Sequence, residues 1–136
     1  MPLTIVAFDI DRFKLVNDNY GHSAGDYILK ELSSVVREKL IRGNDLFARY
    51  GGEEFCLLLL GSTLIKATEV AERIRTTIEA HQFVFEGRQI PITISAGVAL
   101  KTPKDTTWEQ VWDRADKSLY QSKNNGRNRV TVSPQD

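Results

Sequence analysis

Cysteine and histidine are scarce in this chain, and their scarcity excludes several classes of protein. The single cysteine, Cys56, cannot build a disulfide framework, and two histidines, His22 and His81, are too few for a zinc cluster. Cys56 lies in an apolar run, so we expect a buried, reduced thiol, which fits a cytoplasmic location. Neither histidine is arranged with Cys56 or a serine for nucleophilic catalysis, and we interpret both as structural or solvated.

Long hydrophobic runs and an excess of one charge are also missing. No apolar stretch approaches the roughly 20 residues of a membrane-spanning helix, and the first residues lack a signal-peptide pattern. Eighteen basic and eighteen acidic residues give a formal net charge of zero, so neither long nucleic acid nor an anionic membrane is an expected partner. A small anionic ligand held by a few local charges is compatible with this composition.

The pattern of apolar residues predicts a mixed α/β domain. With 136 residues the chain is long enough to bury a core, and we expect a single domain over residues 1–136. Capping boxes are predicted at Ser23/Asp26 and at Thr107/Gln110, before helical runs. The predicted elements are strand 3–8, helix 13–20, a helix from 23 to before Gly43, strands 46–48 and 55–60, helix 64–78, a small hairpin at 83–90, strand 92–100, helix 108–124 and strand 129–132.

Two adjacent carboxylates follow a glycine pair between two strand-like segments. Gly51-Gly52 predicts a tight hairpin with a primed turn, in which both central residues need a positive φ. Glu53 and Glu54 repel one another and are poor strand formers, so stability alone gives little reason for them here. They are either solvated turn residues or ligands of a cation.

A further carboxylate, Asp9, ends the first predicted strand. A lone aspartate at this place is often a helix cap or a turn residue, and the role of Asp11 is less clear. If the helices cross over between the first and second strands, those strands run parallel, and the turn that holds Glu53 emerges beside Asp9. Carboxylates that converge there make a hard-oxygen site, which selects Mg²⁺ or Mn²⁺ over zinc.

Three motifs in this order resemble the GGDEF family of diguanylate cyclases. They are Phe8-Asp9-Ile10-Asp11, then Asn17-Asp18-x-x-Gly21-His22-x-x-Gly25-Asp26, then Gly51-Gly52-Glu53-Glu54-Phe55, a variant of the family signature. The resemblance runs from about Leu3 to Val132. It implies an α/β (α+β) sandwich with a ferredoxin-like βααββαβ core, similar to class III nucleotide cyclase and polymerase palm domains.

The resemblance implies synthesis of cyclic di-GMP from two GTP molecules, with release of two pyrophosphates. Each domain holds one GTP, so a homodimer is the expected active unit, with two Mg²⁺ or Mn²⁺ ions per active site. The implied metal ligands are Asp9, the carbonyl of Ile10 and Glu53. Glu54 is either a further ligand or the group that helps deprotonate the attacking hydroxyl, so both glutamates are candidate catalytic residues.

The resemblance also implies residues that bind the nucleotide. Asn17 and Asp26 match the guanine-recognition positions, although each is also explained by turn and capping chemistry. The phosphate-binding candidates are the backbone of Phe13 and Lys14, together with the side chains of Lys123 and Arg127. The two basic side chains also suit the negative end of the last helix.

A second site is implied for inhibition by the product cyclic di-GMP. Arg42 and Asp45 form the family's Arg-x-x-Asp motif ahead of Gly51, and Arg73 matches a further arginine. Guanidinium groups bind phosphate or the Hoogsteen edge of guanine through two parallel hydrogen bonds. Without the resemblance, residues 42–45 read as an exposed loop.

The sequence departs from the family pattern at its start. Family members normally carry an earlier segment with an Asp-x-Leu-Thr-Gly-Leu-x-Asn-Arg motif, often after a regulatory or dimerising domain. Here the chain begins almost on the first strand, so it is either a fragment or lacks the helix that supports the active site. A longer protein with an N-terminal regulatory domain, including a membrane anchor, fits this departure.

Two other functions stay open at this stage. A catalytically silent domain that binds GTP or cyclic di-GMP and signals through a partner is the main alternative. Cyclisation of another purine nucleotide is the second, although Asn17 and Asp26 match the guanine pattern. The intact glutamate turn and the intact Asp9 favour the cyclase.

Overall fold

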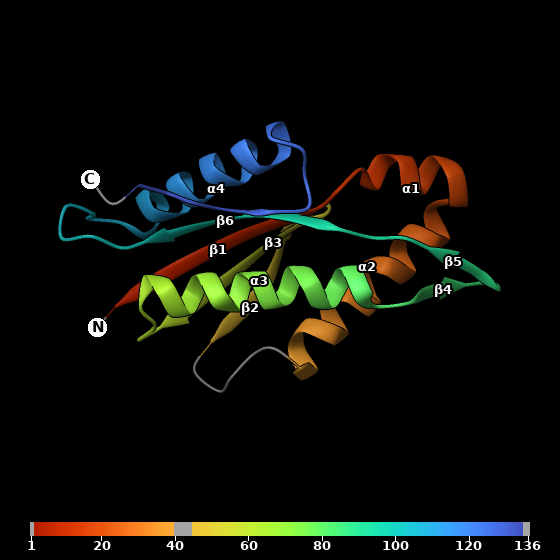
Figure 1. Ribbon diagram of the computed structural model, residues 1–136, viewed down its shortest axis with the longest axis horizontal. Helices are drawn as coiled ribbons and strands as arrows, with labels where there is room; N and C mark the ends of the chain where they lie inside the picture. Colours follow the sequence, from red (N-terminus) through yellow and green to blue (C-terminus); the bar gives the residue numbers. More distant parts are fainter. Residues whose placement is uncertain (1, 40–44, 135–136) are drawn as a thin grey trace.

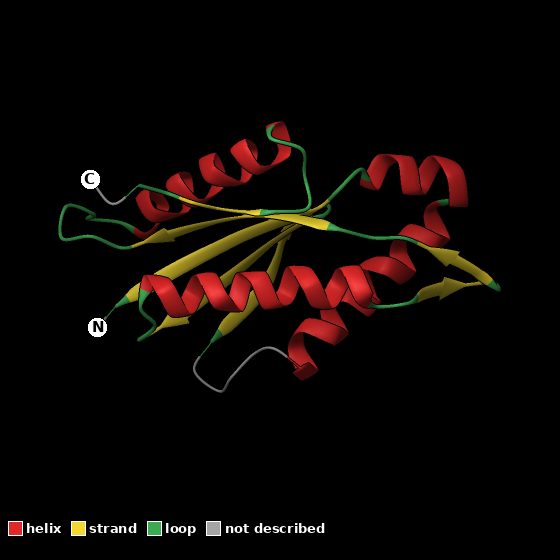
Figure 2. Ribbon diagram, viewed as in Figure 1, coloured by secondary structure: helices red, strands yellow, loops and turns green. Residues whose placement is uncertain are grey.

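The computed structural model describes residues 2–39 and 45–134, and it forms a five-stranded sheet between helices (Figure 1). In Figure 2 the helices are red, and the strands of the sheet and of a separate two-stranded hairpin are yellow. The elements in chain order are β1 (Leu3–Ile10), α1 (Phe13–Tyr20), α2 (His22–Lys39), β2 (Leu46–Gly51), β3 (Glu54–Leu60), α3 (Leu64–Ala80), β4 (Phe83–Phe85), β5 (Arg88–Ile90), β6 (Ile94–Leu100), α4 (Trp108–Asn124) and β7 (Val130–Val132).

The sheet has β1 at its centre and the strand order β2-β3-β1-β6-β7. All neighbouring strands are antiparallel except β6 and β7, which are parallel. This arrangement confirms the predicted α+β class and the βααββαβ core, with the β4–β5 hairpin inserted before β6. None of the helices in the described ranges is long and apolar enough to cross a membrane.

Helices cover both faces of β1, which explains its continuous apolar sequence. Val6 and Phe8 belong to the larger core, which includes buried residues of α2 and α3, whereas Ile5 and Ala7 pack with α4. In the larger core the Phe8 ring is stacked on Phe55 with ring centroids 5.0 Å apart. The strand that carries the first candidate carboxylate is therefore held rigidly on both sides.

The register of the sheet brings the two acidic segments together. Asp9 on β1 is the Cα partner of Glu54 on β3, and the backbone N–H of Ile10 donates to the carbonyl of Glu53 at 3.3 Å. β1 and β2 run in the same direction with β3 between them, so the turn after β2 lies at the carboxyl end of β1. The predicted convergence of Asp9 with the glutamate turn is confirmed.

The predicted conformation of the glycine pair is wrong. Neither Gly51 nor Gly52 has a positive φ, because β2 is bulged between Arg49 and Gly51 and Gly51 is already the partner of Glu54. The bulge increases the local twist, and the chain reverses through Gly52 and Glu53 instead. A Cβ atom on either glycine meets no atom within 4 Å, so open space lies beside both.

Three smaller expectations are also corrected. Helix α2 begins at His22, directly after the C-cap Gly21, which has a positive φ of 95°, so Ser23 lies inside the helix and no Ser23/Asp26 capping box forms. The spacing of apolar residues predicts Trp108 on the buried face of the last helix, but Trp108 is the first residue of α4 and is 46 % exposed, because the helix meets the sheet only further along. Cys56 is half-buried rather than buried, and burial raises the pKa of its thiol to about 11.

Candidate active site

Asp9 is the most deeply buried carboxylate at the acidic edge of the sheet. It is 2 % exposed, and its Oδ2 accepts a hydrogen bond from Nζ of Lys123 on α4. Its Oδ1 is buried and has no hydrogen-bond partner. Burial raises the pKa of Asp9 to about 6, opposed by Lys123 and reinforced by the charges of Glu53 and Glu54.

The unpartnered oxygen of Asp9 suits a cation. Burying a carboxylate oxygen without a donor is costly, and a divalent ion is one group that removes this cost. Within the described ranges, no three carboxylate, imidazole or thiol side chains lie close enough to form a metal site alone. Mg²⁺ commonly binds through one or two carboxylates and takes its remaining ligands from substrate phosphates and water, so Asp9 with the glutamate turn fits such a site.

Lys123 reaches Asp9 because α4 lies very close to β6. A Cβ atom on Gly97 would lie only 2.1 Å from the carbonyl oxygen of Ala115, so no other residue fits at that position. In the last turn of the helix, the Ser122 hydroxyl donates to the carbonyl of Ala96 at 2.8 Å. These contacts seat the last turns of α4 on the sheet, and they place Lys123 over the end of β1.

Asp11 is bound by protein donors on both oxygens. Its Oδ1 accepts from the Ser95 hydroxyl at 2.6 Å, and its Oδ2 accepts from the Thr93 hydroxyl at 2.8 Å and from the Asn128 backbone N–H at 3.0 Å. Asp11 therefore joins the end of β1, the start of β6 and the turn after α4. The sequence left its role open because these donors lie far along the chain.

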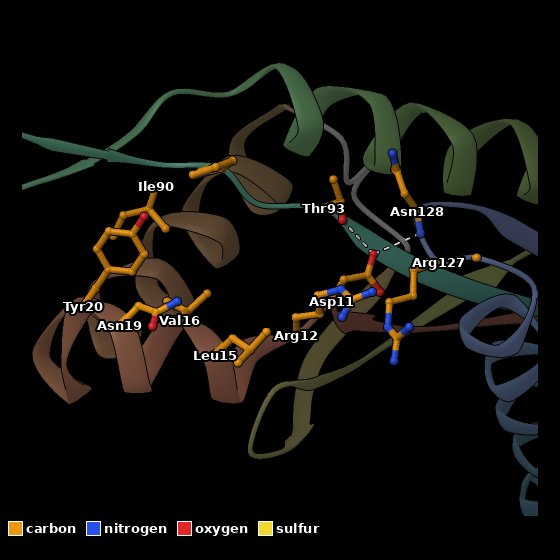
Figure 3. A pocket seen from close by; sticks show the side chains of 12 residues that line it. Asp11, Arg12, Leu15, Val16, Asn19, Tyr20, Ile90, Thr93, Arg127 and Asn128 are labelled. Carbon is orange, nitrogen blue, oxygen red and sulfur yellow. Dashed lines mark hydrogen bonds between the residues drawn. The ribbon is translucent and has the colours of Figure 1, made fainter.

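Arg127 lies on that turn and lines a cavity of about 330 Å³ between the turn and α1 (Figure 3). Gly126, Arg127 and Asn128 have φ values of 120°, 63° and 47°. Figure 3 shows Arg12 and Arg127 on either side of Asp11, with Tyr20 and Ile90 at the opposite end. In the described part of the chain, no carboxylate lies within ion-pair distance of either guanidinium.

Phe13 and Lys14 form the first turn of α1, directly after the acidic edge. The first N–H groups of a helix have no acceptor within it, so their backbone is available to an anion. Arg12, the residue before the helix, has a left-handed φ of 54° that turns the chain from β1 into α1. Its carbonyl accepts from the N–H of Leu15 at 3.0 Å, which fixes this first turn.

The two guanine candidates lie where α1 meets α2. A Cβ atom on Gly25 would lie 1.9 Å from Oδ1 of Asn17, so the helices approach closely and bring Asn17 beside the turn that carries Asp26. Asp26 is exposed and lines a surface hollow of about 540 Å³ together with Arg37 and Arg49. Asp26 therefore lies at the surface, whereas Asn17 is half-buried between the two helices.

The candidate inhibitory residues are only partly placed. Arg42 lies outside the described residues. Asp45 directly precedes β2, and Arg73 is exposed on α3. The inhibitory site therefore stays a prediction.

The strand order, the two helical layers and the acidic edge define a class of fold. A ferredoxin-like sheet with carboxylates at the end of its central strand is the palm fold of nucleotide cyclase domains. Residues 1–129 match the family model described as "Diguanylate cyclase, GGDEF domain". The chain belongs to this family.

Known proteins similar to the chain carry the same description. Diguanylate cyclase A of Treponema denticola is 45 % identical over 131 residues, which are 96 % of this chain and 35 % of that protein. The active GGEEF domain of a diguanylate cyclase from Vibrio cholerae has a TM-score of 0.91 and 34 % identity, covering 100 % of this chain and 85 % of that one. The GGDEF domain of DgcB from Caulobacter crescentus in complex with c-di-GMP has a TM-score of 0.91 and 33 % identity, covering 96 % and 77 %.

Proposed function

We propose that this domain condenses two GTP molecules into cyclic di-GMP and releases two pyrophosphates. The observation that carries the proposal is the buried, unpartnered Oδ1 of Asp9, which lies at the same sheet edge as Glu53 and Glu54. Stability alone does not account for such an atom, whereas a metal-dependent phosphoryl transfer does. The relatives described as diguanylate cyclases support the same reaction.

The acidic edge would hold the metal ions. Asp9, the Ile10 carbonyl, Glu53 and Glu54 offer only oxygen ligands, so we expect Mg²⁺ or Mn²⁺, with two ions per site. When bound, such ions neutralise phosphate charge and lower the pKa of the attacking 3′-hydroxyl. Glu54 acts either as a further ligand or as the group that accepts the proton of that hydroxyl.

The phosphate chain would lie between α1 and the end of α4. Backbone N–H groups of Phe13 and Lys14 bind it from one side, while Lys123 and Arg127 approach from the other. Negative charge develops on the pyrophosphate as it leaves, and positioned cations stabilise it. Asn17 and Asp26 would select guanine, since an adenine would leave their hydrogen-bonding groups unpaired.

The reaction requires two copies of the domain. One domain holds one GTP, and the 3′-hydroxyl of one nucleotide must reach the α-phosphate of the other, so the active unit is a homodimer. The chain spans 35 % of the length of Diguanylate cyclase A, which leaves room there for a regulatory or dimerising segment. We place the reaction in the cytoplasm, where GTP is available, and we assign product inhibition to Arg42, Asp45 and Arg73.

The test is incubation of the purified chain with GTP and Mg²⁺ at high protein concentration. Chromatography and mass spectrometry should detect cyclic di-GMP with the wild type and with Glu69→Gln, an exposed glutamate on α3, but not with Glu54→Gln. If the isolated chain is silent, an artificial dimeriser fused before Met1 should restore the product. Silence of the fused dimer, with GTP or cyclic di-GMP still bound, would favour the binding domain over the cyclase.

A further inference from the structure

Three residues with a left-handed backbone meet beside the proposed phosphate site. Arg12, Arg127 and Asn128 have φ values of 54°, 63° and 47°, and all three line the same cavity (Figure 3). A residue with a Cβ atom rarely adopts this conformation, and it persists only where its surroundings hold it. Such strain concentrates at functional sites, so the contacts that maintain it are informative.

The backbone of Asn128 is held from the side of the sheet. Its N–H donates to Oδ2 of Asp11 at 3.0 Å and lies 3.1 Å from the hydroxyl of Ser95. The same carboxylate is fixed by the hydroxyls of Thr93 and Ser95. The residue after Arg127 is therefore attached to β1 and β6 by a charged acceptor.

The side chain of Asn128 is held from the side of α3. Its Oδ1 accepts from Nη1 of Arg75 at 3.0 Å, and its Nδ2 donates to Oε2 of Glu79 at 2.7 Å. Arg75 is oriented in turn by Glu72, whose Oε1 accepts from its Nε at 2.5 Å. Asparagine suits this position twice, because it tolerates the left-handed region and because its amide both donates and accepts.

We propose that Asp11, Arg75 and Asn128 are positioning residues for Arg127. Together they fix the turn so that the Arg127 guanidinium, which has no carboxylate partner in the described ranges, faces the phosphates of the nucleotide. The inference rests on the proposed function, in which Arg127 contacts those phosphates. It adds a link from α3 to the phosphate site through Arg75.

The test measures binding of a nucleotide that cannot react. 3′-Deoxy-GTP lacks the attacking hydroxyl, and 3′-deoxy-GMP also lacks the two phosphates that Arg127 would meet. Dissociation constants for both, with Mg²⁺, are measured for the wild type, Asn128→Ala, Arg127→Ala and the double variant. Asn125→Ala is the matched control, since it removes an exposed amide from the same turn.

We expect Asn128→Ala to weaken 3′-deoxy-GTP binding about tenfold and to change 3′-deoxy-GMP binding less than about twofold. In the Arg127→Ala background the same substitution should cost nothing further, because a positioning residue acts only through the residue that it positions. Asn125→Ala should bind both nucleotides like the wild type. If Asn128→Ala unfolds at the assay temperature, Arg75→Gln takes its place with an expected loss of about threefold.

Two results would overturn the inference alone. These are an equal loss for both nucleotides, which indicates general damage to the site, and a full additional loss in the Arg127→Ala background, which indicates an independent role. A third result, unchanged 3′-deoxy-GTP binding by Arg127→Ala itself, would remove the phosphate role of Arg127 from the proposed function and this inference with it.

Discussion

Asp9 lies near the end of β1, Asp11 lies directly after the last residue of that strand, and both are buried, yet their surroundings differ completely. Asp11 accepts hydrogen bonds from three donors of the protein, whereas one oxygen of Asp9 has none. A satisfied buried carboxylate stabilises the fold, while an unsatisfied one costs stability unless something outside the chain binds it. Asp11 therefore serves the structure of the domain, whereas Asp9 is the candidate for a functional role, although only one residue separates them.

Replacement of Asp9 should produce the largest change in activity. Asp9→Asn keeps the shape but removes the charge that would hold the metal, so cyclic di-GMP synthesis should fall at least about hundredfold. The melting temperature should be unchanged or higher, because a costly buried charge is gone. A variant that is inactive and also strongly destabilised would place Asp9 in the same class as Asp11.

Replacement of Asp11 should produce the largest change in stability. Asp11→Ala leaves the hydroxyls of Thr93 and Ser95 and the N–H of Asn128 without their acceptor, at an expected cost of about 2–4 kcal/mol. Urea unfolding measures this free energy, and the exposed Asp18→Ala serves as the control. A cost equal to that of the control would show that the three donors find other partners.

Acid should affect Asp9 and Asp105 in opposite directions. The folded-state pKa of Asp9 is raised from 3.8 to about 6, so the folded state favours the protonated carboxyl. The stability that Asp9 contributes is therefore fully present below about pH 4. Up to about 3 kcal/mol of this stability is lost as pH rises through 6. Hydrogen bonds from Arg114, at 2.6 and 2.8 Å, hold the pKa of Asp105 well below its usual range. The contribution of Asp105 is therefore present above about pH 4 and is lost as pH falls below it.

Unfolding of metal-free protein from pH 3 to pH 7 separates the two effects. Relative to the wild type, Asp9→Asn should gain stability as pH rises from about 4 to about 6. Asp105→Asn should lose most at neutral pH and least in acid. Saturating Mg²⁺ should diminish the advantage of Asp9→Asn, since the ion binds the ionised carboxylate. Parallel curves for all three proteins would contradict both assignments.

The exposed Asp26 extends the comparison to a carboxylate at the surface. Asp26→Ala should leave stability within about 0.5 kcal/mol of the wild type, because surface substitutions rarely cost more. It should reduce the preference for GTP over ATP about tenfold if Asp26 accepts from guanine. Competition between the two nucleotides, followed by the rate of product formation, measures this preference. An unchanged preference would remove Asp26 from the guanine site.

The sequence predicted the elements whose signals are local. In α3, Ala67, Ala71, Ile74 and Ile78 are buried at the helical spacing that predicted them. The convergence of Asp9 with Glu54 was also predictable, because parallel directions of β1 and β2 determine which sheet edge the glutamate turn occupies. Patterns of period and direction are therefore sufficient for the fold and for the position of the acidic edge.

The features that escaped prediction depend on distant partners or on small backbone shifts. The role of Asp11 depends on Thr93, Ser95 and Asn128, which are 82, 84 and 117 residues away in sequence. The bulge in β2 moves the turn by one residue, and two adjacent glycines in the sequence do not indicate such a bulge. The hydrogen bonds of Asp11 and the register of β2 with β3 become visible only in the three-dimensional structure.

The contact at Gly97 determines which side of α4 faces the sheet. The helix backbone at Ala115 and Leu119 lies against Gly97, and Lys123 follows on the same side after one further turn. One residue inserted between Leu119 and Lys123 would turn the lysine by about 100° and carry it away from Asp9. The number of residues between the glycine contact and the lysine is therefore fixed, and α4 should not tolerate a single-residue insertion in this interval.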